Sequence, residues 1–371
     1  MSESNSLMDS SHTLPHVPLD SAEAYQESIP ELVKHTNARI LSIADSIEIT
    51  GENPWSVVED NHRNHAMFMS NVFFIGEYKL LARTLPWVYK VYTARGFSRN
   101  YFPEVVRSFI EGVSLVIPPD KSGEILAIYN WMLMNHDKVL NLSCEVSEKE
   151  LPGGPEWLHR KTAFLKALLR GDSRECLRIS SESVKSPGDI EEFYVQVIQP
   201  AMYEVGALWE NNEISVAQEH LASAIVTRTI SSLNVLASAD HIKGKRAVVT
   251  ASTSEFHEIG AWMVSDHFEY LGWQVRYLGA NTPISDLMDL LEDFKPSILA
   301  LSVTMPFNLV HARELIDTVK GNNTTRNINV LVGGRVFNEN PELWETIGAD
   351  GYAADVSAID SVIGGWDEQR L

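Results

Sequence analysis

The sequence predicts a multidomain chain in which two helical domains precede a doubly wound α/β domain with a parallel sheet. Its 371 residues, 44 % of them hydrophobic, exceed the usual size of one domain and can bury more than one core. Proline and glycine interrupt the chain at Leu151–Pro155, which predicts a domain boundary. After residue 245, short apolar runs alternate with helical segments, as in repeated β-α units.

Composition divides the chain into a tail and three domains. Residues 1–20 are polar and serine-rich, and we expect a flexible tail there. Residues 21–150 have helical patterns and predict a helical N-terminal domain. A four-helix bundle is expected over residues 156–242, and the α/β domain over residues 245–371.

The helical domains contain one expected break and four expected bundle helices. Between His65 and Tyr92 the N-terminal domain is mostly apolar, and Pro86 should kink or break the helix. Short joins separate the later helices, which favours an antiparallel bundle. The bundle helices are predicted over Glu156–Leu169, Ser173–Ser183, Asp189–Asn211 and Ser215–Ala239.

Apolar runs bounded by turn residues predict the sheet. Its strands are expected over Arg246–Ser252, Gln274–Gly279, Ile298–Val303, Asn329–Val332 and Gly351–Ala354. The helices that follow them are expected over Gly260–Leu271, Ser285–Phe294, Val310–Lys320, Pro341–Ile347 and Val356–Ile363. Ser285 is expected to cap its helix.

Charge and cysteine content exclude several classes of protein. The formal net charge of −20 argues against binding to nucleic acid or to an acidic membrane surface, because both require a basic face. Cys144 and Cys176 are too few for a disulfide framework, and the N-terminus lacks the features of a signal peptide. No apolar run reaches transmembrane length. We therefore expect a cytoplasmic protein.

The most informative segment is Glu255-Phe-His257-Glu-Ile-Gly260, which directly follows the first predicted strand. Neutral imidazole is a good ligand for cobalt, and a carboxylate on its other nitrogen fixes the tautomer and raises its basicity. Gly260 leaves room for a bulky group where the next helix begins. Solvated loop histidines are common, so the spacing alone does not establish a ligand.

Small polar residues follow two further strands. Ser302 and Thr304 come after the third strand, and Gly333 and Gly334 after the fourth. Ligand sites of open α/β sheets lie beyond the carboxyl ends of the strands, so these residues could line a slot for a buried ligand tail. Ordinary turn chemistry explains each pair taken alone, but their order after the histidine loop favours a site.

This constellation resembles the flavodoxin-like cobalamin-binding domain of methionine synthase, corrinoid methyl carriers, mutases and light-dependent cobalamin receptors. The resemblance implies that His257 is the lower cobalt ligand and Glu255 its supporting carboxylate. The nucleotide tail of the cofactor would enter a slot lined by Ser302, Thr304, Gly333 and Gly334. Two residues depart from the family pattern, since Glu255 replaces the usual Asp and Thr304 the usual Leu.

The predicted bundle resembles the cap that covers the cofactor in these proteins. Nine residues separate Trp209 from Glu219-His220, a spacing that resembles light-sensing adenosylcobalamin receptors. The resemblance implies that Trp209 covers the adenosyl group and that Glu219 and His220 contact it. An indole supplies a flat apolar lid, and a carboxylate accepts hydrogen bonds from ribose hydroxyls. Taken singly, Trp209 would be a core residue and Glu219-His220 a helix surface.

The N-terminal domain resembles that of photocobilins, which sense light with cobalamin and with the bilin biliverdin. A bilin site needs aromatic walls and cations for two propionates. The candidate residues are Trp87, Tyr89, Tyr92, Arg95 and His136. The alternative for each of them is a helical core with surface arginines.

Together the resemblances predict a photocobilin-type light sensor. No residue set for turnover is evident, so we do not expect an enzyme. Light would break the cobalt–carbon bond of adenosylcobalamin and so shift the bundle relative to the sheet. This shift would change the assembly of a homo-oligomer, and the new assembly would signal to a separate output protein. The repressors of the family have a histidine where this chain has Glu210.

Two alternatives to the light sensor remain. One is a corrinoid methyl carrier of a methyltransferase system, against which the Trp209 lid speaks because the upper face must stay open for transfer. The other is a flavodoxin-like binding domain that holds no corrin.

Overall fold

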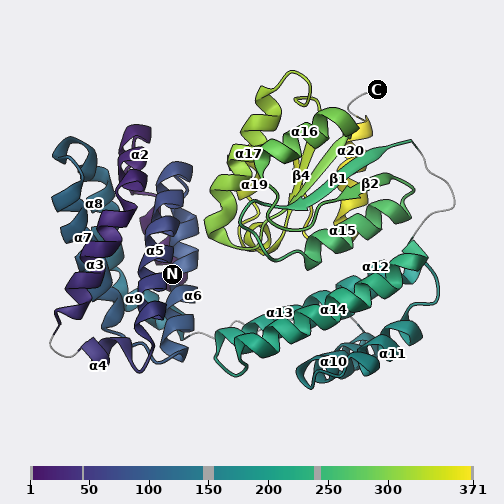
Figure 1. The fold of residues 1–371 in the computed structure, drawn as a ribbon, viewed down its shortest axis with the longest axis horizontal. Coiled ribbons are helices and arrows are strands. Elements are labelled where there is room, and N and C mark those ends of the chain that lie inside the picture. Colours follow the sequence, from purple (N-terminus) through teal and green to yellow (C-terminus); the bar gives the residue numbers. More distant parts are fainter. Residues whose placement is uncertain (1–2, 44–45, 145–153, 238–243, 369–371) are drawn as a thin grey trace. The chain divides into compact units, whose positions relative to one another are not determined.

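The chain forms two compact units (Figure 1). The first is Met1–Glu148 with Glu210–Asn212, and the second is Lys149–Trp209 with Glu213–Leu371. The first is helical, and the second contains helices and a five-stranded parallel sheet, so the predicted fold class is confirmed. The predicted boundary at Leu151–Pro155 lies mostly outside the described residues. The computed structural model describes residues 3–43, 46–144, 154–237 and 244–368.

Helices make up the regular structure of the first unit. They are α1 (Glu3–Ser11), α2 (Leu19–Glu27), α3 (Ile29–Leu41), α4 (Ser46–Thr50), α5 (Trp55–Ile75), α6 (Tyr78–Ala94), α7 (Tyr101–Val116), α8 (Pro119–Met134) and α9 (His136–Ser143). Within the described ranges of the whole chain, no helix combines the length and apolarity that crossing a bilayer demands.

The expected flexible tail over residues 1–20 contains α1 and the start of α2 instead. Leu7 of α1 is 1 % exposed, and the Trp131 indole N–H donates to Ser10 Oγ over 3.1 Å. Few apolar side chains, among them Leu7 and Val17, hold this polar segment, so its composition did not indicate the helix.

The break between α5 and α6 falls at Gly76 rather than at Pro86. Gly76 ends α5 with φ 72°, a left-handed conformation that favours glycine. Helix α6 then continues through Pro86, with Leu85 buried before the proline and Tyr89 buried after it.

The bundle of the second unit consists of α10 (Pro155–Leu169), α11 (Ser173–Ser183), a composite helix and α14 (Val216–Ala237). The composite helix is α12 (Gly188–Phe193), the π-helical turn η1 (Tyr194–Ile198) and α13 (Gln199–Glu210). Sequence patterns predicted this stretch as one regular helix. Pro200 has no N–H to donate one turn back, and the N–H of Gln199 bonds to the carbonyl of Tyr194, five residues earlier.

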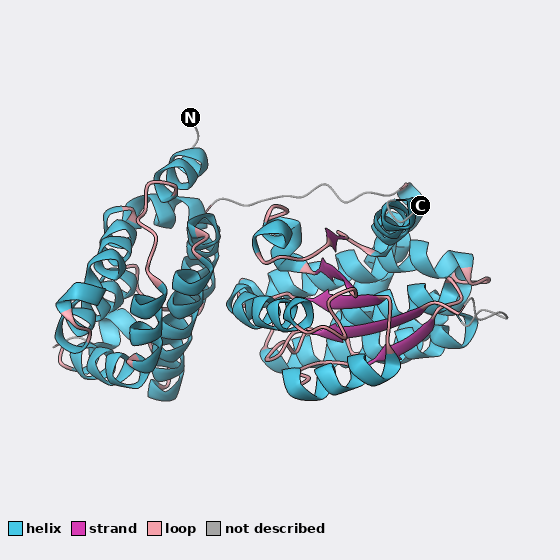
Figure 2. Cartoon of the chain, turned by 90° about the horizontal axis from the view of Figure 1, so that it is seen from above, coloured by secondary structure: helices cyan, strands magenta, loops and turns pink. Residues whose placement is uncertain are grey.

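The parallel sheet has the strand order β2-β1-β3-β4-β5, with helices on both faces (Figure 2). Because the order reverses between β1 and β3, their carboxyl ends flank the switch point of a doubly wound fold. The strands are β1 (Arg246–Ala251), β2 (Gln274–Tyr277), β3 (Ile298–Ser302), β4 (Asn329–Gly333) and β5 (Gly351–Tyr352).

Further helices connect the strands. They are α15 (Ile259–Tyr270), α16 (Ile284–Phe294), η2 (Pro306–Asn308), α17 (Leu309–Gly321), α18 (Arg335–Glu339), α19 (Leu343–Thr346), η3 (Val356–Ala358) and α20 (Ile359–Glu368). The capping role expected for Ser285 is not observed, because Pro283 occupies the N-cap of α16 and Ser285 lies inside its first turn.

Bundle and sheet share one hydrophobic core in the second unit. Buried side chains of α10, η1 and α14 join those of β1 and α15, among them Phe164, Val197, Val226, Val249 and Phe268. Because apolar burial contributes about 25 cal/mol per Å², this shared core holds the bundle on the α/β half.

A buried polar cluster crosses the same boundary. Asp266 of α15, 1 % exposed, accepts a hydrogen bond from Tyr194 Oη at 2.5 Å and another from Asn234 Nδ2 at 2.5 Å. Burial raises the pKa of the Asp266 carboxyl to about 6, although these two bonds lower it, and the charge of Glu269 adds to the rise.

Asp266 should make stability depend on pH. The raised pKa means that the folded chain keeps a proton that the unfolded chain loses, so stability falls as the pH rises from about 4 to about 6. Urea unfolding across this range should show the fall in the wild type, on the order of 2 kcal/mol, and not in Asp266→Asn. Asp317→Asn, at an exposed aspartate of α17, is the charge-matched control and should behave as the wild type. An equal pH slope in Asp266→Asn would contradict the assignment.

Candidate functional site

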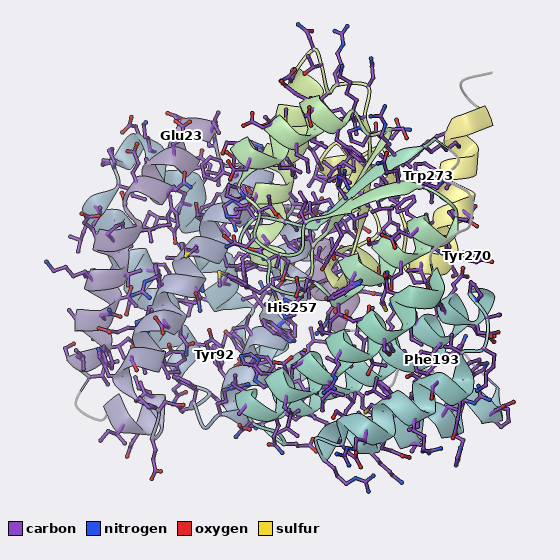
Figure 3. All side chains as sticks on the ribbon, turned by 45° about the vertical axis from the view of Figure 1, so that its right-hand side comes forward. Glu23, Tyr92, Phe193, His257, Tyr270 and Trp273 are labelled. Carbon is purple, nitrogen blue, oxygen red and sulfur yellow. The ribbon has the colours of Figure 1, made fainter. Side chains whose placement is uncertain are left out.

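The candidate site lies at the switch point of the sheet. The loop after β1 carries Glu255 and His257, and the loop after β3 carries Thr304. The main-chain N–H of Ser252 donates to the carbonyl of Ser302 over 3.0 Å, which joins the ends of the two strands. Figure 3 shows His257 at the edge of the sheet that faces the bundle. This is the edge where open α/β sheets bind ligands.

Glu255 organises both loops. It is 1 % exposed, and its Oε2 accepts hydrogen bonds from Thr304 N (2.9 Å), Met305 N (2.9 Å) and Asn308 Nδ2 (3.0 Å). Its Oε1 lies 2.5 Å from His257 Nδ1 and accepts from His257 N at 3.1 Å. Burial alone would raise the pKa of the carboxyl, but the bonds from His257, Met305 and Asn308 outweigh it and lower the pKa to about 2.

The His257 ring is oriented for coordination. The carboxylate engages Nδ1, which leaves Nε2 as the nitrogen available to a metal, and 57 % of the side chain is exposed. The bond to Glu255 raises the pKa of the imidazole, burial lowers it, and the charge of Glu219 raises it further. Arg335, at the start of α18, acts in the opposite direction. The charges of Glu219 and Arg335 thus act at the imidazole from two other elements.

The strand-end residues leave little room for larger side chains. Gly334 has φ 105°, and a Cβ there would lie 2.3 Å from the carbonyl oxygen of Val303. A Cβ at Gly333 would lie 3.0 Å from the carbonyl oxygen of Ala353. Ser302 is half-buried at the end of β3. Glycine at 333 and 334 thus permits close backbone approach where the slot was predicted.

Two further residues of the predicted site, Gly260 and Thr304, differ in their contacts. Gly260 is exposed near the start of α15, and the nearest contact for an added Cβ is Ser302 Oγ at 3.9 Å. Thr304 contributes a main-chain N–H to Glu255, a contact that the prediction of a slot residue did not include.

The predicted lid residues lie at adjoining helix ends. Trp209 is half-buried near the end of α13, and Glu219 and His220 lie in the first turns of α14. Glu219 pairs with His220 Nδ1 at 2.6 Å and accepts from Ser223 Oγ at 2.7 Å. The His220 side chain is 74 % exposed. The charge of Glu219 therefore raises the pKa of His257, and the His220 imidazole remains accessible to solvent.

Sequence analysis missed Asn308 and Arg335. Asn308 is 1 % exposed and donates both to Glu255 and to the carbonyl of Ser254 at 3.3 Å. A buried carboxylate requires donors, and an asparagine shortly after the third strand was a signal for one. Arg335 follows the predicted Gly333-Gly334 pair directly, and its charge at the same edge was overlooked.

The candidate residues of the first unit are partly brought together. Tyr89 Oη lies 3.0 Å from His136 Nδ1, and the Tyr89 ring stacks on Phe102 with centroids 3.7 Å apart. Tyr92 stacks on the same phenylalanine at 6.0 Å. Arg95 donates to the carbonyl of Val91 over 3.0 Å.

Several buried polar atoms in the first unit have no hydrogen-bond partner among the described residues. They include Trp87 Nε1, His62 Nε2 and His65 Nε2. Burial lowers the pKa of His62 to about 4 and that of His65 to about 3, where the charge of His62 adds to the effect. Native interiors rarely leave such atoms unpaired, so this unit has polar groups to offer to a bound molecule.

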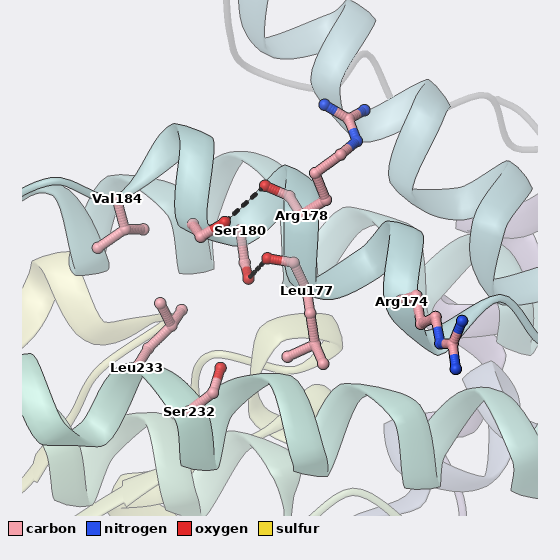
Figure 4. Close-up of a pocket in the computed structure, with 8 residues that line it drawn as sticks. Arg174, Leu177, Arg178, Ser180, Val184, Ser232 and Leu233 are labelled. Atoms are coloured by element: carbon pink, nitrogen blue, oxygen red, sulfur yellow. Dashed lines mark hydrogen bonds between the residues drawn. The ribbon is translucent and has the colours of Figure 1, made fainter.

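A surface pocket of about 480 Å³ lies between α11 and α14 (Figure 4). Ser180 and Ser181 in its wall donate to carbonyls of their own helix, and Arg178 pairs with Glu175 and Glu182 at 2.6 Å each. None of the candidate cofactor residues lines it.

The site has one histidine with an oriented nitrogen and no complete metal centre of its own. Among the described residues, no group of three or more His, Cys, Asp or Glu side chains could hold a metal ion. A single imidazole above a slot suits a metal that brings its own equatorial ligands. The fold and site therefore define an open α/β domain, packed against a helical bundle, with an oriented histidine at its ligand-binding edge.

Comparisons with known proteins support this class. Residues 245–359 match the family model of the B12 binding domain, and residues 161–234 match a second model, also described as a B12 binding domain. The first match covers the sheet and the histidine loop, and the second covers the bundle. Cobalamin binding is therefore supported for the second unit.

The relatives are corrinoid proteins and a repressor. Dimethylamine corrinoid protein 1 of Methanosarcina acetivorans is 25 % identical over 187 residues, which cover 50 % of this chain and 86 % of that protein. The HTH-type transcriptional repressor CarA of Myxococcus xanthus is 26 % identical over 215 residues, 57 % of this chain and 70 % of the repressor. The solved monomethylamine corrinoid protein of Methanosarcina barkeri aligns with a TM-score of 0.49 and 16 % identity, over 56 % of this chain and 97 % of its own. These comparisons do not support the light-sensing type that the sequence predicted.

Glu255 should be required for the stability of the site. Glu255→Ala removes the acceptor of three buried donors and the partner of His257, and each buried group left unpaired costs about 1–3 kcal/mol. We expect urea unfolding to show a loss on the order of 3 kcal/mol. Glu314→Ala, an exposed glutamate of α17, is the control and should change stability by less than about 0.5 kcal/mol. Equal losses in the two variants would refute the role of Glu255.

Proposed function

We propose that the second unit holds cobalamin with His257 as the lower cobalt ligand. One observation carries the proposal: a buried carboxylate fixes Nδ1 of an exposed imidazole at the switch point of the sheet. Glu255 would hold the imidazole proton on Nδ1 and so keep Nε2 aimed at the metal. Gly260 would leave space for the corrin. The nucleotide tail would lie against Ser302, Thr304, Gly333 and Gly334.

Removal of the imidazole tests this proposal. With cobalamin bound, His257→Ala should lose the spectral features of an imidazole below cobalt and bind the cofactor at least about tenfold more weakly, as for loss of a metal ligand or its supporting shell. Absorbance spectra and a cobalamin titration measure both effects. His159→Ala, an exposed histidine of α10, is the control and should match the wild type. An unchanged spectrum in His257→Ala would rule out the assignment.

The named relatives favour one use of such a cofactor, namely methyl carriage. The dimethylamine corrinoid proteins align with this chain over most of their own length. Bound cobalamin would supply a cobalt that accepts and returns a methyl group. In this function the chain would bind and orient the cofactor and leave catalysis to a separate methyltransferase. The comparisons support methyl carriage better than light sensing.

One specific observation favours the second function, a light sensor that uses adenosylcobalamin. Trp209 and Glu219 occupy adjoining helix ends, and the charge of Glu219 acts on His257. An indole and a carboxylate there would cover an adenosyl group, whereas a methyl carrier requires an open upper face. Loss of the adenosyl group would release the bundle. The released bundle would change the assembly of a homo-oligomer, and this change would signal to a separate protein.

Illumination separates the two functions. We load the full chain with adenosylcobalamin in the dark, illuminate it with green light, and follow its absorbance and its mass in solution. A sensor should change spectrum and mass with light, and Trp209→Ala should weaken adenosylcobalamin binding more than methylcobalamin binding. Trp366→Ala, at a half-buried tryptophan of α20, is the control. Light-independent mass and equal loss for both cofactors would favour the carrier.

We also propose that the first unit binds biliverdin. The unpartnered Trp87 Nε1, His62 Nε2 and His65 Nε2 suit the pyrrole and lactam groups of a buried tetrapyrrole. The predicted residues Tyr89, Tyr92, Arg95 and His136 would add walls, a cation and a hydrogen-bonding imidazole. Biliverdin added to the full chain should give a red-shifted absorbance band. Absence of this band would refute the proposal that the first unit binds biliverdin.

A further inference from the structure

The loop after β2 contacts the loop that carries His257, although none of its residues belongs to the predicted site. We call the former, residues 278–283, the β2 loop and the latter, residues 253–258, the histidine loop. Thr253 Oγ1 donates to the carbonyl of Thr282 over 3.0 Å. Because β1 and β2 are parallel neighbours, both loops start at the ligand edge of the sheet.

One residue in each loop has a left-handed backbone. Ser254 of the histidine loop has φ 64°, and Asn281 of the β2 loop has φ 55°. Asparagine tolerates this region because its short amide can bond locally, whereas serine is uncommon there. A residue keeps such a conformation only when its surroundings hold it. The turn at Ser254 therefore depends on the contacts of its two peptide groups.

Two asparagines from different loops make those contacts. The main-chain N–H of Ser254 donates to Asn281 Oδ1 over 2.9 Å, and its carbonyl accepts from Asn308 Nδ2 at 3.3 Å. Asn281 follows β2 and Asn308 follows β3, and these strands flank β1 on its two sides. The left-handed turn is thus held from both neighbouring strands.

The turn at Ser254 sets the directions of the residues that follow it. Glu255 comes next and is 1 % exposed, while the side chain of His257 is 57 % exposed. Asn308 also donates to Glu255 at 3.0 Å, so its removal would disturb two contacts at once. Asn281 is exposed and can be replaced without opening the core, so it offers the cleaner test.

The β2 side also approaches the far end of the histidine loop. Gly279 has φ 73°, and a Cβ there would lie 3.1 Å from Glu258 Oε2. Tyr277 Oη, at the end of β2, lies 3.4 Å from the carbonyl oxygen of Glu258. Because Glu258 directly follows His257, the histidine loop is contacted from the β2 side both before and after the imidazole.

We propose that Asn281 is a positioning residue for His257. Its amide oxygen holds Ser254 in the left-handed turn, and the turn fixes the place of the imidazole at the ligand edge. A metal ligand that is already held in its bound position loses less freedom on coordination and binds more tightly. The effect on cobalamin rests on the proposed function; the effect on the histidine loop does not.

Three substitutions separate the hydrogen bond from the backbone conformation. Asn281→Gly removes the acceptor and keeps the turn of the β2 loop, because glycine adopts a positive φ without strain. Asn281→Asp keeps an acceptor oxygen and should restore the wild-type behaviour. Lys295→Gly, at the left-handed C-cap of α16 with φ 50°, is the matched control outside both loops. Both positions are exposed, so all three variants should fold.

Hydrogen exchange in the cofactor-free chain measures how firmly the histidine loop is held. The main-chain N–H of His257 donates to Glu255 Oε1, so its exchange rate, followed by NMR, reports opening of the loop beyond the turn. Asn281→Gly should speed this exchange about three- to tenfold, as expected for the loss of one hydrogen bond. The amide of Val249, buried in β1, reports global unfolding and should not change.

The other two variants should match the wild type at both amides. Unchanged exchange at His257 in Asn281→Gly, or equal acceleration in Lys295→Gly or Asn281→Asp, would overturn the proposal.

A double-mutant cycle with cobalamin separates this inference from the proposed function. In the wild-type background Asn281→Gly should weaken cobalamin binding about three- to tenfold, and in the His257→Ala background it should have no further effect, because Asn281 acts through the imidazole. Equal weakening in both backgrounds would overturn the positioning role. If exchange changes as expected but His257→Ala leaves cobalamin binding unaltered, Asn281 still positions His257 and the proposed cobalt ligand fails.

Discussion

The candidate site depends on the burial of one carboxylate, that of Glu255. A buried charge is tolerated only when donors satisfy it, and here the donors come from the loop after β3 and from the loop of Glu255 itself. The same group therefore fixes the two strand ends at the switch point and the tautomer of His257. The fold itself therefore orients the His257 imidazole, and no further residue is required for this.

A second buried carboxylate, Asp266, shows how the number of donors decides the outcome. Both groups are 1 % exposed, and burial pushes both pKa values upward. Glu255 has several donors, including an imidazole, and its pKa is lowered to about 2; Asp266 has two donors from neutral groups beside the carboxylate of Glu269, and its pKa is raised to about 6. The first is a permanent ion at the ligand edge, and the second titrates near neutrality where bundle and sheet meet.

The regular elements could be predicted from the sequence, because burial on both faces makes parallel strands such as β3 continuous apolar runs. His257 and Glu255 could be predicted because their spacing encodes a local contact. Asn308 was missed, since its contact with Glu255 forms only when the loops after β1 and β3 meet. The π-helical turn and α1 were missed because a proline-driven shift in register and one buried leucine leave no periodic signal.

The two proposed uses of the cofactor place opposite demands on the same helix ends. A carrier must expose the upper face at each transfer, and a sensor must cover it until light acts. The bundle is held on the α/β half by the shared core and by the buried bond between Tyr194 and Asp266, so a ligand beneath Trp209 would add its own contacts to that packing. A methyl group offers an indole little apolar contact and an adenosyl group offers much, so the size of the upper ligand would set the population of the closed state. The apolar contact between the upper ligand and Trp209 would therefore distinguish a carrier from a sensor.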